Sequence, residues 1–131
     1  MTLENLLKIQ QLHLETFNRR EFSGLRNAAV DRLKDSENAT LSYSSRFDLA
    51  YSAAHGLALA ALRAKGFRTD KRYLVFQCLI YTVGLDKADT RIFSLCHERR
   101  NLAQYEGYFE ADEPLLKELI RTTKILNQLV K

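Results

Sequence analysis

The sequence predicts an all-α protein, an antiparallel up-down bundle of five to six helices. Apolar residues recur at intervals of three or four positions in most segments, which is the spacing of one helix face. Only five glycines and one proline occur among 131 residues, so little of the chain is used for turns. Residues 73–81 contain several β-formers but lack a clean apolar–polar alternation. We therefore expect a single helical domain covering residues 1–131 and no strand.

Two helices are expected before residue 40. Residues 2–16 are predicted to form an amphipathic helix, either a member of the bundle or an element added to it. Its apolar stripe consists of Leu3, Leu6, Leu7 and Leu14. The second helix is predicted over about 21–37. Its inward-facing positions are Phe22, Leu25, Ala29 and either Leu33 or Val30. The polar residues 38–44 are typical of a loop.

The third helix is predicted to be the central one. Ser45 followed by Asp48 fits a capping box, so this helix is expected to begin at Ser45 and to end near Gly66. Its side chains are mostly small, which lets neighbouring helices come close. One face carries Phe47, Tyr51, Ala54, Ala58 and Leu62.

Three more helices are predicted in the second half of the chain. The first starts after Thr69 and Asp70, and Gly84 suits its C-terminal cap. Its apolar residues are Tyr73, Val75, Phe76, Leu79, Ile80 and Val83. The second covers about 86–106 and ends at Gly107, and residues 109–111 form a short connection. Pro114 fits the first turn of the last helix, where its missing N–H costs nothing. The apolar set of that helix is Leu115, Leu119, Ile120, Leu126 and Val130.

Charge and cysteine content narrow the class of protein. The net charge of +4 permits RNA or another polyanion as a partner but does not demand one. Cys78 and Cys96 form neither a disulfide framework nor a metal-ligand spacing, which favours buried free thiols in a reducing compartment. Residues 1–14 contain polar and charged positions throughout, and no apolar run approaches the ~18 residues of a membrane span. We expect a cytoplasmic protein with no membrane contact, no metal and no cofactor.

The segment 95–107 contains the most informative pattern, an Arg100-Asn101 pair followed by Tyr105. On a helix, Arg100 and Gln104 share a face, and Tyr105 lies about 140° further round from Arg100. A guanidinium beside an amide and a phenol can grip a phosphate. The same side chains can equally form a satisfied polar patch between helices.

Two blocks of the sequence resemble the HEPN (higher eukaryotes and prokaryotes nucleotide-binding) superfamily. Residues 47–68 look like its Ala-rich core helix with a Gly66-Phe67-Arg68 exit, and residues 99–106 look like its R-N-x-x-x-[H/Y] signature. The resemblance covers roughly residues 20–130. Within the superfamily, the chain is similar to small bacterial stand-alone proteins.

The resemblance implies a helical bundle that forms a homodimer, in which two copies of the motif face each other in one cleft. Active members of the family are metal-independent ribonucleases, and some belong to toxin–antitoxin pairs, which implies an antitoxin-like partner. Arg100 matches the motif arginine and Asn101 its polar residue, whereas Tyr105 stands where the catalytic histidine belongs. In some toxin–antitoxin relatives a tyrosine just beyond the motif is nucleotidylated, and Tyr108 lies one residue away from that spacing.

The tyrosine at the histidine position argues against efficient RNA cleavage. Arg100 can stabilise the charge on a phosphate, but an unperturbed phenol has a pKa of about 10 and is a poor base at neutral pH. The leading hypothesis is therefore a module that binds RNA or a nucleotide through a degenerate motif. The candidate binding residues are Arg99, Arg100, Asn101, Tyr51 and Tyr105. One alternative is an active metal-independent ribonuclease that uses Arg100 with His97 or Tyr105, and another is a protein-interaction module with a purely structural motif.

Several of these residues also have structural interpretations. His97, three residues before Arg100, is a substitute base, although a partly exposed helix residue without a special role is the favoured interpretation. His55 is expected to be a satisfied core or interface imidazole. Arg99 is expected in an ion pair with Asp48, Glu98 or Glu106, and for Arg100 and Asn101 the same structural interpretation stays open beside the functional one. Tyr51 and Tyr105 are expected to hydrogen-bond near the motif and close the pocket. A solvated turn is favoured over an RNA footprint for the basic cluster of Arg63, Lys65, Arg68, Lys71 and Arg72.

Overall fold

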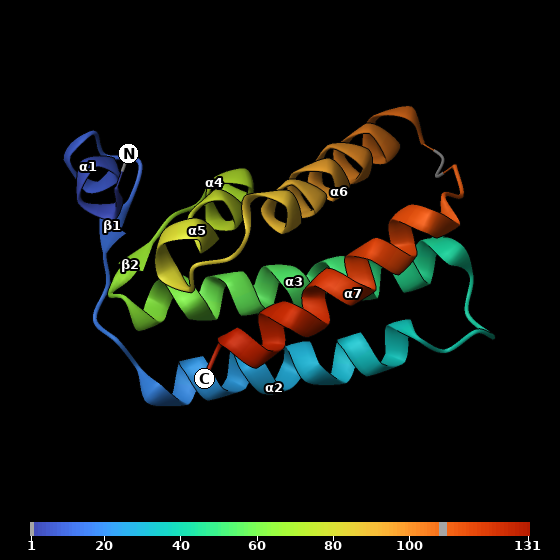
Figure 1. Cartoon of the computed structure of the whole chain (residues 1–131), viewed down its shortest axis with the longest axis horizontal. Helices are drawn as coiled ribbons and strands as arrows, with labels where there is room; N and C mark the ends of the chain where they lie inside the picture. Colours follow the sequence, from blue (N-terminus) through green and yellow to red (C-terminus); the bar gives the residue numbers. More distant parts are fainter. Residues whose placement is uncertain (1, 108–109) are drawn as a thin grey trace.

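Four long helices run alternately up and down and make up most of the protein (Figure 1). The computed structural model describes residues 2–107 and 110–131. The long helices are α2 (Arg19–Ser36), α3 (Tyr43–Ala64), α6 (Lys87–Glu106) and α7 (Glu113–Leu129). The predicted all-α, antiparallel bundle is confirmed.

Helix α3 is the central element, as predicted. Its Phe47, Tyr51 and Leu62 are at most 1% exposed, and α2 packs closely along it. Gly56 lies at this contact, where an added Cβ would lie 3.6 Å from the Leu25 carbonyl oxygen, an ordinary van der Waals distance. The predicted capping box at Ser45 is wrong by one turn, because Ser42 is the N-cap and its hydroxyl accepts a hydrogen bond from the Ser45 N–H.

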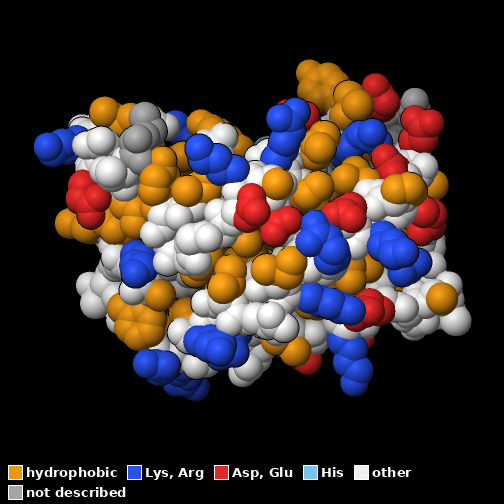
Figure 2. Space-filling model, in the orientation of Figure 1, with side chains coloured by type: hydrophobic (Ala, Val, Ile, Leu, Met, Phe, Trp, Pro, Cys, Tyr) orange, Lys and Arg blue, Asp and Glu red, His pale blue; other side chains and the backbone are white. Residues whose placement is uncertain are grey.

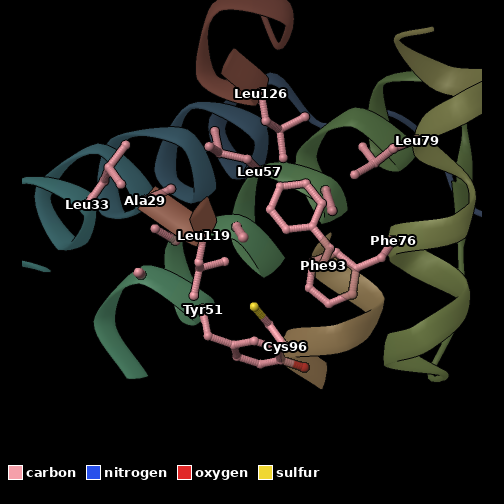
Figure 3. Close-up of a cluster of buried hydrophobic side chains, with 14 of the residues drawn as sticks. Ala29, Leu33, Tyr51, Leu57, Phe76, Leu79, Phe93, Cys96, Leu119 and Leu126 are labelled. Atoms are coloured by element: carbon pink, nitrogen blue, oxygen red, sulfur yellow. The ribbon is translucent and has the colours of Figure 1, made fainter. Parts of the chain in front are cut away.

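The main core lies where α3 meets α2, α6 and α7 (Figure 3). Helix α7 contributes Leu116, Leu119 and Leu126, all at most 1% exposed. The Phe76 and Phe93 rings stack with centroids 5.3 Å apart. Of the alternatives in α2, Leu33 faces inward and Val30 is 41% exposed. These contacts fix α6 against α3, which positions the motif.

The N-terminal segment differs from its prediction. Helix α1 spans only Leu3–Lys8 and ends before Gln10, which adopts a positive φ of 62°. The chain then extends into the two-residue strand β1 (His13–Leu14), which pairs antiparallel with β2 (Phe67–Arg68). The helix predicted over 2–16 and the absence of strands are therefore wrong. Leu14 is 69% exposed, whereas Leu12 is fully buried.

A second, smaller core forms beneath α1. It joins residues from both halves of the chain, namely Leu3, Leu6, Leu12, Leu62, Phe67, Leu74 and Cys78. Arg63 adds ion pairs at the edge of this core, 2.6 Å to Glu21 and 3.5 Å to Glu15. The N-terminal segment is thus packed onto the end of α3.

The helix predicted after Asp70 is split in two. Helix α4 (Arg72–Gln77) and helix α5 (Leu79–Thr82) meet at Cys78, whose carbonyl oxygen accepts hydrogen bonds from both Tyr81 and Thr82. The local β-branched and aromatic residues have modest helix propensity, so tertiary packing sets this break.

The last two helices match their predictions. Asp86 caps α6 and Gly107 ends it with a φ of 80°, while Pro114 lies in the first turn of α7. The connection predicted at 109–111 lies partly outside the described residues. No helix within 2–107 and 110–131 has the length and apolar character of a membrane span. Both cysteines are free and buried.

Candidate functional site

Three side chains of the α6 motif gather around a tyrosine of α3. The Tyr51 ring belongs to the main core, and its hydroxyl lies at the border of the cluster drawn in Figure 3. This hydroxyl oxygen is 2.9 Å from Nδ1 of His97, and the two rings lie 6.4 Å apart at 23°. A histidine that the sequence analysis favoured as an ordinary surface residue is therefore held by a buried phenol.

The second ring nitrogen of His97 faces Asn101. Nδ2 of Asn101 lies 3.1 Å from Nε2 of His97. Since an amide nitrogen only donates, Nε2 is the acceptor, and the proton of a neutral ring is on Nδ1, from which it is donated to the Tyr51 oxygen. This arrangement orients the imidazole and leaves its lone pair on the side of the exposed Asn101.

Arg100 packs over the same tyrosine. The carbon of its guanidinium group lies 5.0 Å from the centre of the Tyr51 ring, within the range of a cation–π contact. The side chain is 23% exposed, and its Nε lies 3.9 Å from the nearest carboxylate oxygen, that of Asp48. Among the described residues, Nε is buried without a hydrogen-bond partner. Arg100 thus retains unused donor capacity.

A second arginine, Arg72 of α4, completes the group. Phe76 lies four residues further along α4 and contacts both Tyr51 and His55, with ring centroids 5.7 Å and 5.9 Å apart. Residues four apart share a helix face, so Arg72 points to the same region. Its guanidinium acts on the Tyr51 hydroxyl and opposes the effect of burial on the pKa of that phenol.

We call Tyr51, His55, Arg72, His97, Arg100 and Asn101 the arginine–histidine cluster. Burial lowers the pKa of His55 to about 4, and the positive charges of Arg72 and Arg100 act in the same direction. The pKa of His97 is lowered by burial and by the same two arginines, against a smaller opposing effect of Glu98. Burial raises the pKa of Tyr51. At neutral pH the cluster therefore contains two cations, two neutral imidazoles and a neutral phenol.

Sequence reasoning placed Arg72 in a solvated turn and His55 in the core. Neither residue could be assigned to the cluster from the sequence, because α3, α4 and α6 come together only in the folded protein (Figure 1). Figure 2 shows Lys and Arg side chains on both sides of the upper hollow between the α4 and α6 regions.

Two other candidate residues lie outside the cluster. Tyr105 is 94% exposed at the C-terminal end of α6, so it does not close a pocket over the motif. Arg99 pairs with Asp112, the N-cap of α7, at 3.5 Å, and not with the three carboxylates considered from the sequence. The remaining candidate tyrosine, Tyr108, lies outside the described residues.

A hollow lies elsewhere, beside α7. It has a volume of about 830 Å³. Its lining includes Glu37, Arg46, Glu113, Pro114, Leu116, Lys117, Ile120, Arg121 and Lys124. Basic and acidic side chains are mixed on this face (Figure 2), and Lys124 and Glu37 already pair at 2.9 Å. No residue of the arginine–histidine cluster lines it.

Within the described part of the chain, no three His, Cys, Asp or Glu side chains gather in a group suited to a metal ion. Comparisons with protein-family models, with curated proteins and with solved structures give no match. The HEPN resemblance therefore depends on the two sequence blocks, and the chemistry of the cluster has to be judged from its geometry.

Proposed function

We propose that the protein is a nucleic-acid or nucleotide-binding module that holds a phosphate at the arginine–histidine cluster. The observation that carries this proposal is the cationic Arg100, whose side chain is 23% exposed and whose only ion pair among the described residues is a long one, 3.9 Å from Nε to an oxygen of Asp48. Its Nε is buried and has no hydrogen-bond partner among those residues, so a ligand would meet the exposed part of the guanidinium. A phosphate oxygen there would accept a charge-assisted hydrogen bond.

The composition of the cluster supports an anion in preference to a cation. Arg72 and Arg100 bring two positive charges to one neutral phenol and two imidazoles with lowered pKa values. Asn101 adds an exposed amide that can donate to the same ligand. The net charge of +4 favours the approach of a polyanion.

The HEPN-like resemblance supplies the biological part of the proposal. It suggests a homodimer, a cytoplasmic role in a toxin–antitoxin or stress response, and an antitoxin-like protein as a second partner. Helix α6, which carries the R-N motif, is partly exposed along its length. It is therefore open to a ligand or to a partner.

The test is the affinity for a fluorescently labelled single-stranded RNA, measured by anisotropy with excess chelator. Arg100→Ala should weaken binding about 10-fold or more, since a hydrogen bond to a charged group contributes about 1.5–3 kcal/mol. Arg100→Lys should restore only part of the loss, because an ammonium lacks the planar fork. Arg91→Ala, which removes an exposed cation near the start of the same helix, is the matched control. Equal losses in Arg100→Ala and Arg91→Ala would contradict a specific phosphate site.

A second candidate function, metal-independent RNA cleavage, is favoured by the geometry of His97. Its Nε2 lone pair faces the exposed Asn101, and its lowered pKa keeps it unprotonated near pH 7. It could take the proton of a ribose 2′-hydroxyl if that group displaced the amide, with Arg100 stabilising the phosphate. Tyr105, which is remote from the cluster, is a weaker candidate.

Cleavage of an RNA pool in excess chelator separates the two functions. If the protein is a nuclease, His97→Gln should remove about 10²–10⁴-fold of the rate while RNA affinity changes little. Tyr51→Phe should keep the ring packing but lose the contact that orients His97, with a smaller loss. The absence of cleavage in wild type would leave a binding module. The absence of both cleavage and binding would favour the third interpretation, a protein-interaction module with a structural motif.

A further inference from the structure

Tyr105 is the most exposed large hydrophobic side chain among those described, at 94%. Its ring is available to a ligand without any rearrangement of the bundle. Leu102, one turn earlier, is 53% exposed and widens the apolar surface on that side. The exposure of the Tyr105 ring therefore needs an explanation.

The ring continues a row of two cluster residues, His97 and Asn101, along α6. His97, Asn101 and Tyr105 follow one another at intervals of four residues on α6. Residues at this interval lie on nearly the same helix face and about 6 Å apart along the axis. The side chain of Asn101 reaches back to His97, so Tyr105 is the next side chain beyond the cluster.

We infer that Tyr105 is a stacking platform for a base of single-stranded RNA whose backbone is held by Arg72 and Arg100. This inference rests on the proposed function and names its ligand class. Electrostatic contacts that follow the backbone, combined with aromatic rings on which bases stack, are the general basis of single-strand binding. The useful part of Tyr105 is then its ring and not its hydroxyl.

The surroundings of Tyr105 fit a single base better than a second protein surface. Asn101, Gln104 and Glu106 around it are polar and exposed, and Leu102 is its only exposed apolar neighbour within one turn among the described residues of α6. A stable protein interface needs a larger apolar centre, whereas stacking needs one accessible ring. Bases in a duplex are already stacked and paired, so the same site should discriminate against double-stranded RNA.

The experiment measures the affinity of wild type and four variants for a 12-nucleotide RNA of mixed sequence, alone and annealed to its complement. Tyr105→Ser should weaken binding of the single strand about 5- to 100-fold, the range found for removal of one stacking ring. Tyr105→Phe should stay within about twofold of wild type, because it keeps the ring. Tyr81→Ser is the matched control, since Tyr81 is 42% exposed on α5, away from α6. Arg72→Ala should weaken both RNA forms, since it removes a phosphate contact.

Tyr105 is fully accessible, so its variants are expected to fold, and circular dichroism verifies this. Wild-type binding that depends on Arg100 but is unchanged in Tyr105→Ser would overturn the stacking platform and leave the proposed function intact. An equal loss in Tyr105→Phe and Tyr105→Ser would overturn it in favour of a role for the hydroxyl. No RNA binding by wild type would overturn both proposals. Loss of self-association in Tyr105→Ser with unchanged RNA affinity, measured by light scattering, would assign the ring to a second copy of the chain.

Discussion

The neutral histidines give the cluster a dependence on pH that can be measured without a ligand. Burial lowers the pKa of folded His55 from 6.5 to about 4. Between these values the unfolded chain binds more protons than the folded one, so the free energy of unfolding increases with pH across this window. This stabilisation is complete above about pH 6.5 and is lost as the pH falls towards 4. His97 contributes in the same direction.

We expect the free energy of unfolding to fall by up to about 3 kcal/mol between pH 6.5 and 4 because of His55. Urea denaturation at a series of pH values measures this slope. His55→Gln should flatten it. An unchanged slope in His55→Gln would mean that the imidazole is hydrated in the folded protein.

The sequence analysis identified most of the cluster but not its arrangement. Arg100, Asn101, His97 and Tyr51 were candidates because they lie in or near the R-N motif or its resembling block. Spacing on one helix cannot reveal a contact between helices. The 2.9 Å contact of Tyr51 with His97 spans 46 positions in the chain. Arg72 belongs to the cluster because Phe76, on the same face of α4, packs against Tyr51.

At the scale of elements, the close pairing of α2 and α3 centres on Gly56. An added methyl group there would lie 3.6 Å from the Leu25 carbonyl oxygen and 3.7 Å from Cβ of Ala29, which are ordinary van der Waals contacts. Alanine therefore fits, whereas a longer side chain does not. Alanine also favours a helix by about 0.8–1.0 kcal/mol over glycine.

Gly56→Ala is accordingly expected to stabilise the protein by roughly 0.5–1 kcal/mol. Gly56→Leu should destabilise it, since its additional atoms would have to push α2 away. Thermal unfolding of the two variants decides between these outcomes. A destabilised Gly56→Ala would show that α2 and α3 are closer than these contacts indicate.

Helix boundaries were predictable where a capping side chain or a glycine marks them. The predicted end of α6 at Gly107 and the place of Pro114 in the first turn of α7 are confirmed. The capping box predicted at Ser45 is wrong, because Ser42 is the N-cap of α3. The break at Cys78 had no such marker, because it depends on packing against two cores.

At the scale of the whole molecule, the N-terminal segment is part of the fold and not merely attached to it. Leu12 is fully buried in the small core, whereas Leu14, two residues later, is 69% exposed. A continuous helix over 2–16 would have placed Leu14 in its apolar stripe. Leu12 precedes β1, whose two residues His13 and Leu14 are both exposed, so burial in the small core ends where the strand begins.

The buried Leu12 and the exposed Leu14 provide a matched pair of variants. Leu12→Ala should reduce the free energy of unfolding by about 2–5 kcal/mol, the usual cost of emptying a buried leucine site. Leu14→Ala should change it by no more than about 0.5 kcal/mol. Urea denaturation of both variants provides the measurement. The opposite order would favour the helix predicted from the apolar stripe.

The two buried thiols have a consequence for how this molecule opens. Cys78 lies in the small core and Cys96 in the main core, and burial raises their pKa values to about 11 and about 12. Thiol reagents attack the thiolate, so either sulfur reacts only when its surroundings separate. The alkylation rate of each cysteine thus reports how often the core that contains it opens. Faster alkylation of Cys78 than of Cys96 would mean that the N-terminal segment separates from the end of α3 while the main core remains closed. Equal rates would mean that both cores open in one cooperative event.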